Sequence, residues 1–314
     1  LTNALYTLKW IHRPVGERFK IISGLQGMHQ WNTNAPNASD RLVPDSRTLD
    51  QGAFLTTQYG NAAWNVQAGV RYDMRFLIAD VSDVSDFSKR YSGLNVSAGG
   101  VYHQERTTFR ASFSSGFRAP HLTELLSNGF HHGALRYEIG DRDLNPEYAQ
   151  QVDLTAELTG EHLVVVYNPF VNRISDFIYL QPLGYSVDGI PAFAYKALSE
   201  VTYYGNDVGL HYHPHFAHDL HFETTWSYIK ANSPSDSSVS MLPPQRIQTS
   251  LRYTFDGDAL IRLKEINVMH TYMGAQRTVA NLETPSAAYQ VVDVAIGFSL
   301  GRNALWDLRV GCKN

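Results

Sequence analysis

The chain has 314 residues, of which 43% are hydrophobic and 12% aromatic, and its formal net charge is −4. A mildly acidic chain lacks the basic face that nucleic-acid binding requires, so no nucleic-acid partner is expected. The sequence has no run of about 18 apolar residues, which excludes a long helical membrane span. The single cysteine, Cys312, excludes an internal disulfide and is interpreted as a small structural residue.

Apolar and polar residues alternate along much of the chain. The pattern is clearest at residues 64–75, 220–228 and 292–300, where every second residue is apolar and most residues between them are polar or small. A period of two is typical of β-strands with one apolar and one polar face. Because almost no helical stretch exists to cover the apolar faces, lipid is the leading candidate for covering them.

Two kinds of connection alternate between the predicted strands. Short polar turns are predicted at 13–17, 104–106, 159–161, 214–219, 256–258 and 301–303, and long polar loops at 32–48, 79–87, 119–147, 182–191, 232–245 and 280–287. Tight turns at one end and long loops at the other are typical of an up-and-down barrel, whereas a soluble sandwich has no reason to sort its connections. About 14 strands are predicted, at 4–13, 17–32, 49–60, 63–78, 88–104, 106–118, 148–159, 162–181, 192–213, 219–231, 246–256, 265–279, 288–300 and 305–314.

The most specific motif lies between residues 113 and 147. A strand ends in an aromatic-Arg-Ala-Pro element, a Glu-Leu pair follows, and a Gly-Asp-x-x-Leu-x-Pro-Glu segment opens the next strand. This order resembles the TonB-dependent outer-membrane receptors, with Asp141 where asparagine is commoner. Residues 42–47, 68–73, 242–246 and 307–314 are also similar to that family. The motif residues are Phe117, Arg118, Ala119, Pro120, Glu124, Leu125, Gly140, Leu144, Pro146 and Glu147.

The resemblance implies the fold and its setting. It predicts an all-β protein, an antiparallel up-and-down transmembrane β-barrel in the outer membrane of a Gram-negative bacterium. Residues 1–314 would form one barrel fragment of about 14 strands, from a family barrel of about 22 strands. The chain begins without methionine and shows no signal peptide, so it is expected to be part of a longer, processed protein. Neither the plug domain nor the last strand of the family is expected in it.

The resemblance also implies a function. It predicts energy-coupled uptake of a scarce nutrient, with outer-membrane lipid around the barrel and the TonB-ExbB-ExbD complex acting through the absent plug domain. No bound cofactor is expected. The substrate would be a metal ion or a metal chelate, with siderophore-iron, haem, zinc and cobalamin as candidates. A passive porin-like channel and a soluble all-β carbohydrate-binding protein are the alternatives. The sequence contains none of the common catalytic motifs, so no enzyme is expected.

Candidate ligand-binding residues lie in the 119–147 loop, which faces the outside in the family topology. Histidine and carboxylate together suit zinc or another borderline metal, and imidazole also suits haem iron. His131 and His132 are candidate metal ligands, although neighbours on a strand would point in opposite directions. The alternative is that these are polar loop residues that bind nothing. The candidates are His121, Glu124, His131, His132, Glu138, Asp141 and Asp143.

Two further patterns complete the prediction. A second histidine group, His211, His213, His215, His218 and His221, falls at a short turn, which belongs on the periplasmic side, so weak adventitious metal binding is favoured over a functional site. A separate prediction concerns ion pairing at the barrel rim, where Glu147 is a candidate partner for Arg118 or Arg136. Membrane-interface anchoring is predicted for Tyr59, Tyr72, Trp226, Tyr228 and Tyr253, and a lumen-facing position for Arg71, Asp73, Arg75, Arg110, Glu157, Glu223 and Arg252.

Overall fold

The computed structural model describes residues 1–12, 18–37, 41–80, 87–234, 239, 242–257, 259–280, 283–301 and 305–314. The predicted turn at 13–17 lies outside the described residues. Parts of the predicted connections at 32–48, 79–87, 232–245, 256–258, 280–287 and 301–303 also lie outside them.

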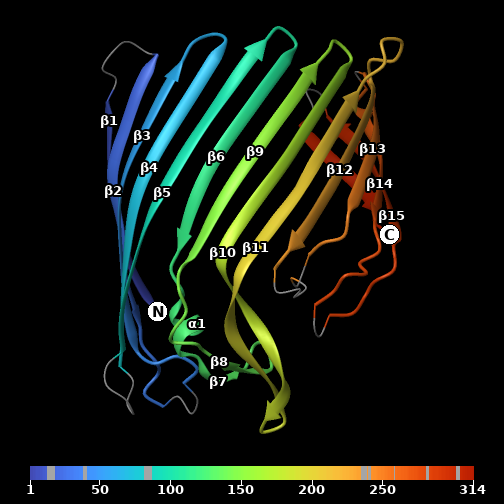
Figure 1. The fold of residues 1–314 in the computed structure, drawn as a ribbon. Coiled ribbons are helices and arrows are strands. Elements are labelled where there is room, and N and C mark those ends of the chain that lie inside the picture. The colour runs from blue at the N-terminus through green and yellow to red at the C-terminus, as the bar shows by residue number, and fades with distance from the viewer. Residues whose placement is uncertain are drawn as a thin grey trace.

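Fourteen strands of the described chain form one continuous antiparallel wall in which each strand pairs with its neighbours along the wall (Figure 1). This confirms the predicted up-and-down order. The wall strands are β1 (Thr2–His12), β2 (Phe19–Asn32), β3 (Ser46–Gly60), β4 (Trp64–Ala79), β5 (Phe87–Gln104), β6 (Thr107–Arg118), β9 (Glu147–Thr159), β10 (Leu163–Val187), β11 (Ile190–Tyr212), β12 (Leu220–Asn232), β13 (Arg246–Thr254), β14 (Ile261–Met273), β15 (Tyr289–Leu300) and β16 (Trp306–Cys312).

The wall is open in the described part of the chain. β1 pairs with β2 and β16 pairs with β15, and the two edge strands do not pair with each other. Figure 1 shows the strands following a curved surface, with β1 at one edge and β15 and β16 at the other. The structure is therefore a partial barrel. No helix in the described residues has the length and apolar character needed to cross a membrane.

The apolar faces of the strands point away from any packed core. Val66, Val70, Trp226 and Val294 each keep 38% to 44% of their surface exposed. On the opposite face of the wall, charged side chains pair with one another, as in the Arg110–Glu157 ion pair at 3.0 Å. An outward apolar face and an inward polar face are what a lipid-embedded barrel requires.

The prediction of a long polar loop at 182–191 is wrong. β10 and β11 continue through most of this segment, and Val187 pairs with Ile190 across a two-residue turn. That turn consists of Asp188 and Gly189, both with positive φ, at 51° and 81°. Asp-Gly is a strong signal for a two-residue hairpin turn, because both positions must adopt this conformation. Pro182 made this segment read as a loop, because proline interrupts a strand pattern. In the structure the β10–β11 pairing accommodates the proline through a register shift between Pro182 and Ser186.

Three short elements were not predicted, and all lie within the 119–147 loop. They are α1 (Leu122–Leu126), β7 (Asn128–His131) and β8 (Arg136–Ile139). β7 pairs with β8, and β8 adds in parallel to the extension of β11. Figure 1 places all three at the end of the wall opposite the short turns, beside the β10–β11 hairpin. The loop therefore has a fold of its own at the long-loop end.

A matched pair of substitutions on β4 tests which face meets lipid. Val70→Arg places a charge on the apolar face and is expected to lower the free energy of unfolding by ~2–4 kcal/mol in lipid vesicles. Gln67→Arg, on the opposite face of the same strand, is expected to change it by less than ~0.5 kcal/mol. The measurement is urea unfolding of the vesicle-embedded protein. Equal losses for the two variants would refute the assignment of faces.

Candidate functional site

The 119–147 loop is held to the barrel rim by one arginine. Arg118, the last residue of β6, donates from Nε to Glu147 Oε2 at 2.5 Å, which confirms one of the two predicted partners of Glu147. Its Nη1 donates to both carboxylate oxygens of Glu124 at 2.9 Å. The other oxygen of Glu147 accepts from the Ile178 backbone N–H at 2.6 Å. Arg118 thus joins the strands before and after the loop to helix α1.

A small hydrophobic core lies beneath the loop. Leu125 of α1 is 1% exposed, and it clusters with Leu144 and with Leu77 from β4. Gly140 passes so close to α1 that a Cβ there would lie 2.6 Å from the backbone nitrogen of Leu126. A side chain would therefore push the two segments apart. Tyr91 closes the core by donating its hydroxyl to the Leu144 carbonyl at 3.2 Å.

The β7–β8 hairpin docks on β11 through a buried carboxylate. Glu138 is 2% exposed, accepts from Arg136 Nε at 2.7 Å, and accepts from the Tyr195 hydroxyl at 3.1 Å. Burial, together with the negative charge of Glu138, raises the pKa of Tyr195 to about 12, so its hydroxyl stays protonated as the donor. The backbone of Glu138 pairs with Phe193 of β11.

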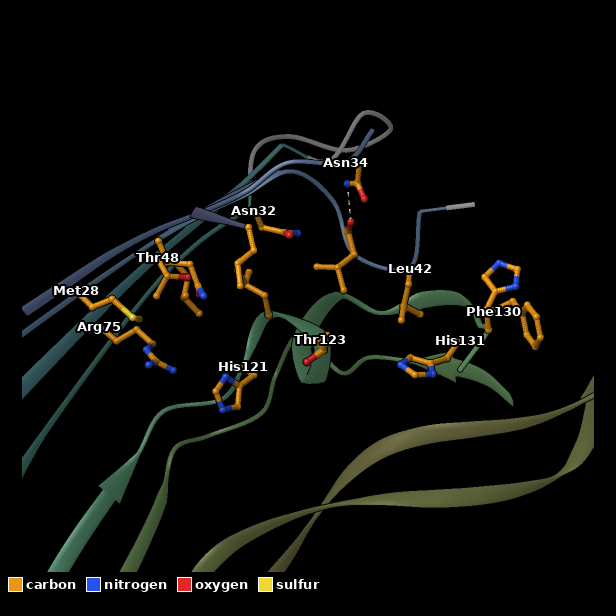
Figure 2. Close-up of a pocket in the computed structure, with 16 residues that line it drawn as sticks. Met28, Asn32, Asn34, Leu42, Thr48, Arg75, His121, Thr123, Phe130 and His131 are labelled. Carbon is orange, nitrogen blue, oxygen red and sulfur yellow. Dashed lines mark hydrogen bonds between the residues drawn. The ribbon is translucent and has the colours of Figure 1, made fainter. Parts of the chain in front are cut away.

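A cavity of about 680 Å³ opens between this loop and the ends of β2, β3 and β4. Figure 2 shows Met28, Thr48 and Arg75 from the strands on one side, with His121 and Thr123 facing them from the loop. The cavity is lined by Leu1, Met28, Gln30, Asn32, Asn34, Leu42, Val43, Thr48, Arg75, Leu77, His121, Leu122, Thr123, Phe130, His131 and His132.

The far wall of this cavity includes Asn34, Leu42 and Val43, and the hydrogen bonds of Asn34 join residues 33–37 to residues 41–45. Asn34 donates from its side chain to the Val43 carbonyl at 2.9 Å and to Asp45 Oδ1 at 2.7 Å. Its backbone N–H also donates to Asp45 at 2.8 Å, and these bonds hold the pKa of the Asp45 carboxyl below its ordinary value. The Leu42 carbonyl accepts from the Asn128 backbone N–H at 3.1 Å, which fastens this wall to β7.

Three of the seven predicted ligand-binding residues, namely His121, His131 and His132, line the cavity. Two of the predicted carboxylates, Glu124 and Glu138, hold the loop in place instead. Glu124 binds Arg118, and Glu138 is buried against Arg136. Asp141 Oδ2 lies 3.7 Å from Lys196 Nζ, and the fully exposed Asp143 lies 3.9 Å from Lys89 Nζ.

The two candidate metal ligands, His131 and His132, do not act as a pair in the structure. The Nδ1 atom of His131 accepts from the Ala134 backbone N–H at 3.0 Å. The ring of His132 packs edge-on against Phe130, with centroids 4.5 Å apart. Within the described residues, no three His, Cys, Asp or Glu side chains converge as a preformed metal site. The cavity therefore presents separate imidazoles to a ligand that would bridge them.

His121 connects this cavity to the polar face of the barrel wall. A smaller cavity of about 280 Å³ shares His121 and Arg75 with the first and continues along Arg71, Asp73 and other residues. Arg75 is held rigid by two bonds of 2.6 Å to the Asp50 carboxylate. Burial lowers the pKa of His121, and the charges of Arg75 and Arg118 add to this, while Glu124 opposes it. The His121 ring is therefore uncharged at neutral pH and can act as a nitrogen ligand.

Sequence reasoning missed the residues that the strands contribute to the cavity. Met28, Thr48 and Arg75 come from strands far from the motif in sequence. Arg75 was assigned only to the lumen-facing row, because period two gives the face but not the height of a residue in the barrel. The resemblance at 42–47 was the available signal that this segment packs on the loop.

The comparisons agree on one family. A family model described as "TonB dependent receptor-like, beta-barrel" matches residues 2–314. No match was found among the curated proteins.

Solved structures with the same fold include two proteins named as transporters and one named as a receptor. The copper transporter OprC is 17% identical with a TM-score of 0.81, and the match covers 99% of this chain and 50% of that one. The FrpB iron transporter from Neisseria meningitidis (F3-3 variant) is 16% identical with a TM-score of 0.71, covering 98% and 50%. A mutant ferric enterobactin receptor, PfeA from Pseudomonas aeruginosa, is 15% identical with a TM-score of 0.69, covering 99% and 48%. The chain spans about half the length of these structures.

The rim pair gives a prediction about loop order. Glu147→Ala removes the acceptor of both Arg118 Nε and the Ile178 N–H, and is expected to lower the local stability of residues 119–147 by ~1–3 kcal/mol. Faster hydrogen exchange in that segment, measured by mass spectrometry, would report the loss. The matched control is Glu161→Ala, because Glu161 is 79% exposed at the short-turn end. Unchanged exchange in Glu147→Ala would contradict the anchoring role.

The buried position of His121 gives a prediction about pH. Its pKa is expected below the ordinary value of 6.5, so the ring stays mostly neutral at pH 6.5. Because the unfolded segment binds the proton more tightly, acidification through 6.5 towards the folded-state pKa destabilises the loop. Histidine NMR titration would measure this, with His121→Asn assigning the signal. A midpoint at or above 6.5 would refute the prediction.

Proposed function

The chain belongs to the TonB-dependent receptor β-barrel family, and we propose that the full protein is an outer-membrane receptor for energy-coupled uptake of a metal ion or metal complex. The long-loop end captures the substrate outside the cell. Transport is driven by the TonB-ExbB-ExbD complex acting through a plug domain in the barrel. The protein acts as a transporter and not as an enzyme.

The observation that carries this proposal is the imidazole-lined cavity at the long-loop end. Its volume of about 680 Å³ lies within the range of small-molecule sites. His121, His131 and His132 supply nitrogen donors, and the Met28 thioether adds a softer one. Imidazole suits zinc, copper and iron, including haem iron, and thioether suits copper in particular. This donor set favours a metal-containing nutrient over a sugar or a peptide.

The anchoring of the loop also supports a receptor. The ion pairs of Arg118 and the docking of β8 on β11 fix the histidines before any ligand arrives. A preorganised site loses less conformational entropy on binding. The names of the similar structures refer to copper, iron and ferric enterobactin, and they describe those proteins. They support siderophore-iron as a candidate substrate and add copper, while haem, zinc and cobalamin stay candidates from the sequence resemblance.

Uptake in a deletion strain tests the proposal. Cells lacking the gene are expected to lose uptake of one of five probes: Zn²⁺, Cu²⁺, haem, ferric enterobactin or cobalamin. In cells complemented with His121→Asn/His131→Asn, uptake of that probe at limiting concentration is expected to fall about thirtyfold, since the two lost ligands cost on the order of 1 kcal/mol each and about 1.4 kcal/mol corresponds to a factor of ten. The matched control is His103→Asn, an exposed histidine near the β5–β6 turn.

Three results would decide against the proposal. Normal uptake of all five probes in the deletion strain would remove the substrate class. Full activity of the double loop variant would remove the cavity as the capture site. Uptake that persists without TonB would favour the passive channel, because a porin needs no energy coupling.

A further inference from the structure

A second and denser group of histidines lies at the opposite end of the wall, near the short turns. Figure 1 shows this end of β10, β11 and β12 far from α1. One histidine precedes β10, three lie at and within the β11–β12 turn, and two lie on the adjoining strand ends. We call them the six-histidine cluster, and its members are His162, His211, His213, His215, His218 and His221.

Strand register brings three of these rings to one level. Leu163 pairs with Tyr212 and Tyr212 pairs with Phe222, so the next residues outward, His162, His213 and His221, lie side by side. The backbone N–H of His213 donates to the His162 carbonyl at 3.0 Å. Ring centroids are 5.0 Å apart for His162–His213 and 5.9 Å apart for His213–His221.

The other three rings complete the group. His211 Nε2 lies 3.2 Å from His221 Nδ1, and the two rings are stacked. His215 stacks on His162 with centroids 5.0 Å apart, and His218 lies 5.3 Å from His215. His162 therefore has rings on two sides, from the strand end and from the turn. The sequence interpretation had grouped five of these histidines, and the structure adds His162 from another turn at the centre.

His162 itself carries an unused nitrogen. Its Nδ1 atom is buried and has no hydrogen-bond partner among the described residues, while its Nε2 lies 3.7 Å from Glu161 Oε1. A buried polar atom without a partner calls for an explanation, and a missing ion is one of the few available. The ring that carries this nitrogen lies 5.0 Å from the ring of His213, 5.0 Å from that of His215 and 6.0 Å from that of His218, measured between centroids.

Ring spacing in the cluster matches what one metal ion requires. Two imidazoles that share a tetrahedral zinc, with Zn–N bonds of about 2.0–2.1 Å, have ring centres about 5 Å apart. Neighbouring rings of the cluster are separated by 5.0 to 6.0 Å. Among the described residues no three side chains already converge on one point, so binding requires the rings to rotate about χ1 and χ2. His215 and His218 are exposed and lie in a turn, where such rotation meets little resistance.

We propose that the six-histidine cluster is a binding site for a borderline divalent cation, Zn²⁺ or Cu²⁺. Neutral imidazole is the preferred ligand of these ions, and the cluster offers more donors than the four that zinc uses. It is separate from the cavity at the long-loop end. The inference that the cluster binds a cation rests only on the geometry of the six histidines. A role for it in receiving cargo that leaves the barrel rests on the proposed function.

Calorimetric titration of the full-length protein in detergent with Zn²⁺ tests the inference. Wild type is expected to bind Zn²⁺ at micromolar concentration or below. His162→Gln/His213→Gln/His221→Gln is expected to bind at least about tenfold more weakly. The control His103→Gln/His270→Gln removes two histidines outside the cluster and is expected to bind like wild type. Triple-variant affinity within twofold of wild type, or wild-type binding only at millimolar Zn²⁺, would overturn the site.

Two further measurements keep the test decisive. The single variant His162→Gln changes only one turn residue, so it replaces the triple variant if that protein fails to assemble; the same weakened binding is expected. Electron paramagnetic resonance of bound Cu²⁺ is expected to show coupling to several imidazole nitrogens, and this coupling should change in His162→Gln. An unchanged spectrum would place the ion elsewhere.

The loop variant His121→Asn/His131→Asn separates this inference from the proposed function. If the loop variant loses uptake while the cluster variants bind Zn²⁺ like wild type, the inference fails and the proposed function stands. If the loop variant keeps full uptake while the cluster variants lose Zn²⁺ binding, the proposed function fails and the cation site stands.

Discussion

Backbone hydrogen bonding in hydrocarbon is the constraint on which the rest of the structure depends. A membrane offers no water to unpaired N–H and C=O groups, so a chain without spanning helices must satisfy them between neighbouring strands. The fourteen wall strands do this through continuous antiparallel ladders. Side chains must then alternate between lipid and lumen, which explains exposed Val66 and Val70 beside the Arg71–Asp73 ion pair on the same strand.

The same constraint places the buried hydrophobic core at the long-loop end of the wall and not between its strands. In the proposed outer-membrane setting, lipid would cover the apolar face of the wall, and the buried side-chain packing of the described residues lies around Leu77, Leu125 and Leu144. There the 119–147 loop folds as a small unit, fastened by Arg118 to Glu124 and Glu147. Each of these residues makes an ion pair whose loss would loosen the loop.

The two ends of the wall present histidine in different ways. At the long-loop end, His121 and His131 are spread around a cavity large enough for a chelate. At the short-turn end, six rings are packed against one another, and one nitrogen of His162 has no hydrogen-bond partner in the part of the chain that the structure describes. Spread imidazoles suit a bulky metal complex, and crowded imidazoles suit a bare ion. This contrast supports assigning the two proposals, nutrient capture and cation binding, to different ends of the wall.

The sequence alone determined the fold class and the number of wall strands, because period-two alternation is a local property of each strand, but its sorting of turns and loops was wrong at 182–191. It also located the loop that carries His121, His131 and His132. The Asp188-Gly189 turn was a readable signal that was overlooked. Only the tertiary structure decided that Glu138 is buried, that Arg75 and Met28 reach the cavity, and that His162 joins the cluster. Those facts depend on strand register and on the position of each residue along the barrel axis. Both bring together residues that are far apart in the chain, and neither produces a periodic pattern in the sequence.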